Sequence, residues 1–443
     1  MASKYNWHEI DWGGMKDDLD RIVALSRYYG SDPDFVLAGG GNTSVKTEDS
    51  LFVKASGVTL ADIGRDGFLE LSREKVRNIM EKTYSRKLLE REEQVKNDLL
   101  EARRLSESEA RPSVETMLHE LICNKFVVHT HPCVINGLTC AREGKSIAAE
   151  LFGSDVLWIE YTDPGYTLSR KVQNALARYR KANQALEKLE QRVQAFEKSL
   201  SKKEGASAPR NGREPAIIFI QNHGVFISAD DPQSIKEITD GVLKRLEDYM
   251  SRRKPEPAFS EMPNRDSRID ELTPAIRAII ATCDPDHSYP VVTYNGSETV
   301  TEFVSSERGE ELAQAGTLTP DQVVYCKRKP LWISQKSADE NVQRVAERIR
   351  TSAKRFVERY GYIPRVVVIE DLGLFGVGDS KRSADNASAV YEDAIKIIRN
   401  SAAFGGPHFM NDRQAKFIDE WEVESYRRRV ASCLLYTSPS PRD

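Results

Sequence analysis

Three histidines lie in positions from which they could bind one metal ion. His129 and His131 flank a threonine at the end of the apolar run Phe126-Val-Val, and His223 lies in a second apolar run, residues 219–227. Residues two apart in a strand point to the same face of a sheet, so both imidazoles of the first run are predicted to project together. Three imidazoles with an open position are typical of a catalytic zinc site, whereas a structural site is closed by four protein ligands. Hydrogen-bonded core histidines are the alternative.

A carboxylate is predicted to act beside these histidines. Glu115 lies in Pro112-Ser-Val-Glu-Thr-Met-Leu-His119 at the expected start of a helix, where Ser113 is a suitable cap. A carboxylate near a metal can be a fourth ligand or, when substrate displaces it, a general base. His119 follows one helical turn later; we expect an ordinary packed histidine there, and a supporting partner of the site is the alternative.

Two turns rich in glycine and hydroxyl side chains each follow a predicted strand. They are Gly40-Gly-Asn-Thr-Ser44 and Lys54-Ala-Ser-Gly57. Small residues expose backbone N–H groups and the hydroxyls add donors, so such turns can bind a phosphate dianion. Neither turn matches the P-loop or the dinucleotide fingerprint, so they do not imply nucleotide binding. Ordinary structural turns are the alternative.

Five motifs in this order resemble the class II aldolase/adducin family. They are Gly39-Gly-Gly-Asn-Thr-Ser44, Lys54-Ala-Ser-Gly57, Pro112-Ser-Val-Glu115, His129-Thr-His-Pro132 and Gln221-Asn-His-Gly224. Residues 319–331, 373–378 and 421–426 extend the resemblance to the middle region of bifunctional rhamnulose-1-phosphate aldolase/lactaldehyde dehydrogenases. In those proteins a short-chain dehydrogenase domain follows. Its absence from these residues leaves two expectations, a gene interrupted at the tail described below or a stand-alone variant.

The resemblance implies a fold and a set of site residues. The implied fold is an α/β/α sandwich around a largely antiparallel sheet, with a bound Zn²⁺ or similar divalent ion and often a fourfold-symmetric homo-oligomer. By motif position, His129, His131 and His223 would bind the metal and Glu115 would be the acid/base. The residues implied around the substrate phosphate are Asn42, Thr43, Ser44, Ser56, Gly57 and Ser113. Family members use a tyrosine to protonate the aldehyde oxygen, for which Tyr161 is the candidate and Tyr166 its neighbouring alternative.

The reaction implied by the resemblance is cleavage of a deoxyketose 1-phosphate, such as rhamnulose-1-phosphate, to dihydroxyacetone phosphate and lactaldehyde. Cleavage leaves a carbanion beside a carbonyl and needs an electron sink, either a lysine Schiff base or a Lewis-acid metal. The motifs supply ligands for a metal and therefore favour the second route. Alternatives at the same site are 4-epimerisation or dehydration of a related sugar phosphate. A non-catalytic, adducin-like binding module is the remaining alternative, although a scaffold has no need of a metal cluster.

Strands and helices must hold these residues, and the sequence predicts two α/β domains. A class II aldolase-like domain covers residues 1–255, and a smaller accessory domain covers residues 265–432 after a proline-containing linker. A charged insertion, about residues 168–210, carries apolar residues at helical spacing and is predicted to form a long helix or helical hairpin. In the second domain, Gly373-Leu-Phe-Gly-Val-Gly378 follows an apolar strand and is predicted to be a structural strand–helix turn. A phosphate or nucleotide loop is the alternative for that segment.

Composition excludes several classes of protein. The 443 residues are 40% hydrophobic and 30% charged, which suits folded domains, and the net charge of −4 argues against a dedicated nucleic-acid binder. No run approaches the roughly 20 apolar residues of a membrane helix, and the first residues lack the apolar core of a signal peptide. Six scattered cysteines without a Cys-x-x-Cys pair indicate a reduced compartment. We therefore expect a cytoplasmic protein that binds a small sugar phosphate and neither nucleic acid nor membrane.

The last residues have a composition of their own. Residues 433–443 read Cys-Leu-Leu-Tyr-Thr-Ser-Pro-Ser-Pro-Arg-Asp and resemble a transposon-type sequencing adapter translated in frame. A disordered Ser/Pro-rich end is the alternative. We expect that this segment is not native, that the natural chain is interrupted near Ser432, and that the segment plays no part in the fold.

Overall fold

The computed structural model describes residues 7–105, 110–200, 214–253, 267–284, 289–335 and 340–421. The predicted non-native tail, residues 422–426 and the last part of the predicted insertion lie outside these residues. Among the helices of the described ranges, none combines the length and the apolar character that crossing a membrane requires.

Seven strands form the larger sheet, in the order β3-β2-β1-β4-β7-β6-β5. All neighbouring pairs are antiparallel except β5 and β6, which are parallel. The strands are β1 (Asn42–Lys46), β2 (Ser50–Lys54), β3 (Phe68–Ser72), β4 (Phe126–Thr130), β5 (Val156–Ile159), β6 (Ile217–Ile220) and β7 (Gly224–Ala229).

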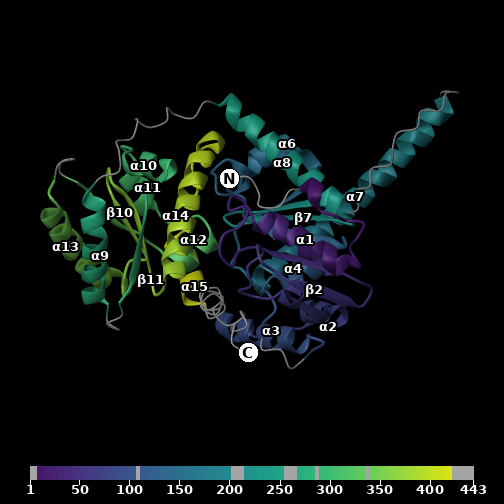
Figure 1. Ribbon diagram of the computed structural model, residues 1–443. Coiled ribbons are helices and arrows are strands. Elements are labelled where there is room, and N and C mark those ends of the chain that lie inside the picture. Colours follow the sequence, from purple (N-terminus) through teal and green to yellow (C-terminus); the bar gives the residue numbers. More distant parts are fainter. Residues whose placement is uncertain are drawn as a thin grey trace.

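Helices cover both faces of this sheet (Figure 1). One face packs on α1 (Asp18–Gly30), α5 (Cys133–Thr139), α6 (Gly144–Phe152) and α8 (Pro232–Arg252), and the other on α4 (Thr116–Leu121) and α7 (Tyr166–Leu200). Neighbouring residues of a strand point to opposite faces, so Val128 lies in the first core and Val127 in the second. The predicted α/β/α sandwich around a largely antiparallel sheet is confirmed.

The predicted charged insertion begins as one long helix. Helix α7 has 35 residues and extends away from the sheet (Figure 1). Its first turns are anchored because Leu168, Val172 and Leu176 are buried against the sheet. Residues 73–101, which are also rich in charge, form α2 (Arg73–Glu81) and α3 (Leu88–Glu101), which pack together beside β3. Short 3-10 helices are η1 (Trp7–Glu9), η2 (Arg65–Gly67), η3 (Gly153–Asp155) and η4 (Ala402–Phe404).

The second sheet has four strands in the order β8-β11-β10-β9. They are β8 (Val291–Asn295), β9 (Leu331–Ile333), β10 (Val366–Ile369) and β11 (Gly373–Gly378). One core contains residues of α10 (Glu298–Val304), α11 (Gly309–Ala315), α12 (Pro320–Cys326), α14 (Lys381–Ser401) and α15 (Asp412–Glu420); the other contains residues of α9 (Arg268–Cys283) and α13 (Val342–Tyr360). The smaller α/β layer predicted for this part of the chain is therefore confirmed.

The glycine-rich segment of this domain is a strand, so its prediction as a loop or turn was wrong. Residues 373–378 are buried in β11 and pair with both β10 and β8. A Cβ atom added at Gly376 would lie 2.2 Å from the backbone oxygen of Ala384, and one at Gly378 would lie 2.3 Å from the Ala384 nitrogen. These glycines let α14 pack directly on the strand. Glycines that lie between an apolar strand and a helix in sequence are also typical of a phosphate loop, so the pattern alone did not distinguish the two.

The second sheet repeats part of the first. The order β4-β7-β6-β5 and the order β8-β11-β10-β9 have the same sequence of antiparallel, antiparallel and parallel pairs. In each, a three-residue turn joins the two central strands, and its middle residue, Asn222 or Asp371, has a φ of 56°. A helix of 21 residues follows each hairpin, α8 in the first domain and α14 in the second. The accessory domain therefore has the architecture of half of the first domain.

Candidate active site

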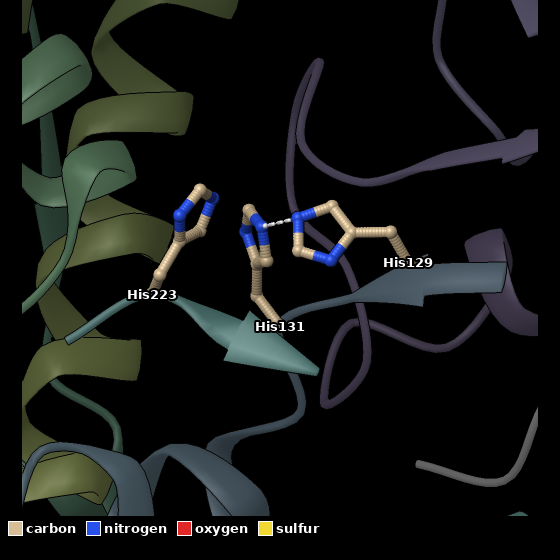
Figure 2. Close-up of side chains that lie close together, drawn as sticks. All are labelled: His129, His131 and His223. Carbon is tan, nitrogen blue, oxygen red and sulfur yellow. Dashed lines mark hydrogen bonds between the residues drawn. The ribbon is translucent and has the colours of Figure 1, made fainter. Parts of the chain in front are cut away.

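The structure brings the three predicted metal ligands together. His129 lies on β4, His131 follows that strand directly, and His223 ends the turn between β6 and β7. Because β4 and β7 are neighbours in the sheet, one ring nitrogen from each histidine lies within 4.8 Å of the others (Figure 2). Gly224 permits the approach, since a Cβ there would lie 2.5 Å from the Thr130 oxygen and 2.7 Å from the His131 ring.

Hydrogen bonds determine which ring nitrogens carry protons. His129 Nδ1 lies 2.9 Å from the backbone oxygen of Val225, which can only accept, so Nδ1 is the donor. His131 Nδ1 lies 2.5 Å from a carboxylate oxygen of Asp321 and donates in the same way. With Nδ1 as the donor, Nε2 is the nitrogen of each ring that can present a lone pair, and the two Nε2 atoms, joined by the dashed line in Figure 2, are 3.0 Å apart. Two lone pairs repel each other, whereas a shared cation would attract both.

Glu115 places its carboxylate against two of the three imidazoles, those of His129 and His223. It occupies the N-cap position of α4, with Oε2 3.4 Å from His129 Nε2 and Oε1 3.4 Å from His223 Nε2. Among the described residues Oε1 has no hydrogen-bond partner, although it is buried. An unpaired buried oxygen is costly, and a cation held by the imidazoles would satisfy it. Three imidazoles and one carboxylate therefore fit Zn²⁺ or a similar divalent ion.

The charge states of these groups also suit a cation. Burial raises the pKa of Glu115, but positive charge on the rings of His129 and His223 and the amide of Asn42 outweigh burial and lower the pKa to about 2. Burial in turn lowers the pKa of His129 well below its usual value. The ionised form of Glu115 and the neutral form of His129 are the forms that bind metal ions.

His119 supports the site from behind. Its ring is fully buried, with Nδ1 2.7 Å from the hydroxyl of Ser44 and Nε2 in hydrogen-bond contact with Asn42 Oδ1. Asn42 in turn donates from Nδ2 to Glu115 Oε2 over 2.6 Å. Burial lowers the pKa of His119 to about 3, so the ring is neutral and can donate to Asn42 from Nε2. Of the two interpretations of His119, the structure favours the supporting one, since the ring orients the amide that holds Glu115.

A cleft with about 520 Å³ of empty space opens beside the histidines. Of the residues implied at the phosphate, Asn42, Ser56, Gly57 and Ser113 line it. The hydroxyls of Thr43 and Ser44 bond within the protein instead, to Ser26 over 2.6 Å and to His119. The phosphate-binding role of all six residues remains a prediction.

Lys54 belongs to one of the sequence motifs, but the sequence suggested no role for it. It is buried, it lines the cleft, and its ammonium group donates to the backbone oxygens of Gly39 over 3.3 Å and Val58 over 2.6 Å. It therefore ties the two glycine-rich turns together and adds a positive charge beside them. A lysine at the start of a predicted phosphate turn was the signal that could have identified it.

The two candidate tyrosines lie outside this cleft. The Tyr161 hydroxyl donates to Asp163 over 3.3 Å, and burial raises its pKa, with the Asp163 charge adding to the effect. Tyr166 lines an adjoining, mostly apolar cavity that shares Ser56 and Val114 with the cleft. The assignment of a tyrosine as proton donor therefore remains a prediction.

Residues of the second domain also reach the site; the sequence had left two roles open for this domain, covering the aldolase pocket or positioning a missing dehydrogenase. Asp321 accepts the hydrogen bond from His131, and Pro320 lines the cleft. The Tyr325 hydroxyl accepts from the backbone nitrogen of Gly39 over 3.1 Å. The backbone oxygen of Leu318 accepts from Asn222 Nδ2 over 3.0 Å, beside His223. The segment that carries these residues stood out in the sequence only as a motif without a role.

Comparisons with known proteins agree with this architecture. A family model described as the class II aldolase and adducin N-terminal domain matches residues 20–242, and one described as the second domain of class II aldolase matches residues 267–363. The uncharacterized oxidoreductase YuxG of Bacillus subtilis is 24% identical over 456 residues, which cover 97% of this chain. The chain spans 60% of the length of this curated relative.

Solved structures also match. The N-terminal class II aldolase domain of a conserved Thermoplasma acidophilum protein is 25% identical, with a TM-score of 0.41, over 56% of this chain and 99% of its own. The L-fuculose-1-phosphate aldolase of Thermus thermophilus is 15% identical, with a TM-score of 0.31, over 53% of this chain and 95% of its own.

Proposed function

Because the chain belongs to the class II aldolase and adducin family, we propose that it is a metal-dependent aldolase of a deoxyketose 1-phosphate. The proposed substrate resembles rhamnulose-1-phosphate, and the products are dihydroxyacetone phosphate and lactaldehyde. The observation that carries the proposal is the cluster of three imidazoles beside Glu115, whose buried Oε1 has no hydrogen-bond partner among the described residues. A binding module would gain nothing from so costly an arrangement.

The histidines and Glu115 divide the chemistry between them. A divalent cation bound by His129, His131 and His223 would supply a Lewis acid that stabilises negative charge on the substrate oxygens as the carbon–carbon bond breaks. Glu115 lies against Nε2 of His129 and Nε2 of His223 and is ionised. It can therefore accept or return the proton at the carbon that becomes the carbanion. Asn42 fixes its orientation through Oε2.

The glycine-rich turns and Lys54 would hold the phosphate. Ser56, Gly57 and Ser113 line the same cleft as Lys54, whose charge complements a dianion. Gly39 and Gly41 also line the cleft. Binding energy from this non-reacting group would position the carbon skeleton against Glu115.

The oxygen of the aldehyde half needs a group that carries its proton. In cleavage its hydroxyl loses a proton as the carbonyl forms, and in the reverse reaction the aldehyde oxygen gains one. Tyr161, which the family resemblance implies, is proposed for this role, and Tyr166 in the adjoining cavity is the alternative. We further propose that the protein acts in the cytoplasm as a homo-oligomer.

Metal analysis followed by a product assay tests the proposal. Purified protein loaded with Zn²⁺ should bind one ion per chain and release dihydroxyacetone phosphate from rhamnulose-1-phosphate, as measured with a coupled reductase. Conversion to an isomer without dihydroxyacetone phosphate would indicate an epimerase, and loss of water would indicate a dehydratase. Absence of both bound metal and turnover would identify an adducin-like module and contradict the proposal.

A further inference from the structure

One segment of the accessory domain contacts three separate parts of the proposed metal site. Residues 317–326 accept hydrogen bonds from Gly39 in the first glycine-rich turn, from the metal ligand His131, and from Asn222 beside His223. These contacts come from the Tyr325 hydroxyl, the Asp321 carboxylate and the Leu318 backbone oxygen. The second domain therefore forms one wall of the site.

We propose that Asp321 is a positioning residue that orients His131 for metal binding. Its carboxylate accepts the Nδ1 proton of His131 over 2.5 Å, which leaves Nε2 as the nitrogen that can bind the metal. A carboxylate behind a ligand histidine also increases the basicity of the ring and holds its plane. His129 has only the neutral backbone oxygen of Val225 in the corresponding place. Asp321 is thus the charged support of the site, and it comes from a different domain than the ligands do.

The first domain leaves room for this carboxylate. A Cβ atom added at Gly40 would lie 2.8 Å from Asp321 Oδ2 and 3.5 Å from His131 Nδ1. The space beside the middle glycine of the first turn is therefore occupied by Asp321 from the other domain. The two domains are complementary at this point, which a chance contact between surfaces would not require.

The local structure holds Asp321 in place. It is 7% exposed and lies in the first turn of α12, where the Thr319 hydroxyl accepts from the Gln322 nitrogen over 3.3 Å and Pro320 fixes the entry of the chain. The Gln322 side chain then accepts from the Leu318 nitrogen over 2.8 Å. The carboxylate is thus presented by a braced turn rather than by a free loop.

The position of α12 in the repeat agrees with a dedicated role. The connection from α6 to β5 in the first domain consists of η3, residues 153–155. The corresponding connection from α11 to β9 in the second domain spans residues 316–330 and contains α12. Helix α12 therefore has no counterpart in the first domain, and it is the segment that reaches His131.

Metal affinity of Asp321→Asn tests this proposal, which rests on the proposed metal site but not on the substrate. Asparagine has nearly the same shape but accepts the histidine proton without a charge, so Zn²⁺ affinity measured by chelator competition should fall by about 10–100-fold. The spectrum of the Co²⁺-loaded variant should change with it, whereas Asp321→Glu should restore part of the affinity.

The control is Asp419→Asn, which removes a carboxylate of similar burial that pairs with Lys327 within the second domain. It should leave Zn²⁺ affinity unchanged.

The tautomer of His131 gives a second readout that needs no variant at Asp321. Nitrogen NMR of wild-type protein with labelled histidines, assigned with His131→Ala, should show the proton of His131 on Nδ1. A proton on Nε2, or Zn²⁺ affinity of Asp321→Asn within about twofold of wild type, would overturn the proposal. Wild-type protein that shows the expected tautomer and affinity but cleaves no sugar phosphate would leave Asp321 as the positioning residue and refute only the proposed substrate.

Discussion

The two sheets of this protein share one architecture, but only the first carries a metal-ligand cluster among the described residues. In the first, His129 on β4 pairs with Phe226 on β7, and in the second, Tyr294 on β8 pairs with Phe375 on β11. The turn between the central strands ends in His223 in the first sheet and in Leu372 in the second. The same backbone thus holds imidazoles in one copy and a tyrosine and a leucine in the other.

The second copy is closed by its own side chains. The Tyr294 hydroxyl donates to the backbone oxygen of Leu372 over 2.8 Å, across the position that corresponds to the space between the histidines. The strands and the hairpin therefore do not make a catalytic site by themselves. Function depends on which side chains the shared framework presents.

The first copy also receives groups from outside the repeat. Glu115 and the glycine-rich turns come from the part of the first domain before β4, and Asp321 comes from α12, the segment added to the second copy. A working site at this hairpin thus needs three contributions: the histidines, the carboxylate with the phosphate turns, and the support of the ligand ring.

The largest expected effect comes from making the first copy resemble the second. In His223→Leu, two imidazoles would remain, and Zn²⁺ affinity should fall by roughly 10³-fold or more, because about 10–16 kcal/mol of zinc binding is shared among about four ligands. Aldolase turnover should disappear with the metal. Elemental analysis after dialysis measures the first effect. The reciprocal variant, Tyr294→His in the second sheet, should still bind one ion per chain. Retention of zinc by His223→Leu would contradict the conclusion that the imidazoles make the first sheet a metal site.

The next effect separates the carboxylate from the histidines. Glu115→Gln should keep the metal, because the three imidazoles remain, but turnover should fall by on the order of 10²–10⁴-fold, since the amide cannot transfer the proton. The control is Glu120→Gln on the same helix, where the carboxylate pairs with Arg73 and Arg77. That variant should keep wild-type turnover, and wild-type turnover in Glu115→Gln would remove Glu115 from the mechanism.

A smaller effect tests why the second copy has glycines where the first has larger residues. By strand register, Gly376 corresponds to Ile227, and a Cβ at Gly376 would collide with the backbone of α14. Gly376→Ala should therefore cost about 1–3 kcal/mol of unfolding free energy, as measured with urea. In the helix after the first hairpin, exposed Gly241 has open space around it, and Gly241→Ala should instead stabilise by about 0.5–1 kcal/mol. Equal effects at the two glycines would contradict this interpretation of the packing.

The smallest effect concerns the polar support behind the first copy. Because burial lowers the folded-state pKa of His119 to about 3, the unfolded chain takes up a proton below its pKa of about 6.5 while the folded protein does not. Stability is therefore lost as the pH falls, by about 1.4 kcal/mol for this group between about pH 7.5 and 5.5. Urea unfolding of metal-free wild type and His119→Gln should show that difference in pH dependence. Identical pH dependence of the two proteins would mean that His119 is protonated in the fold.

Local patterns in the chain were sufficient to predict much of this protein. Alternating and helical apolar spacing indicated α/β domains, and the histidine, glutamate and glycine-rich motifs predicted the residues that the structure brings together around His129. This worked because each motif is a short segment whose backbone geometry depends on neighbouring residues. The same reliance on local pattern explains the error at Gly373–Gly378, where glycines that allow a helix to pack on a strand resembled a loop.

The support of the site could be seen only after the domains were assembled. Asp321 is separated from His131 by 190 positions, and no periodicity relates the two residues. The burial of Glu115 Oε1, the hydrogen bond from His119 to Asn42 and the accommodation of Asp321 at Gly40 depend likewise on long-range packing. A side chain's type shows what chemistry it can perform, but its partner, tautomer and charge depend on which distant groups the fold places within hydrogen-bond distance.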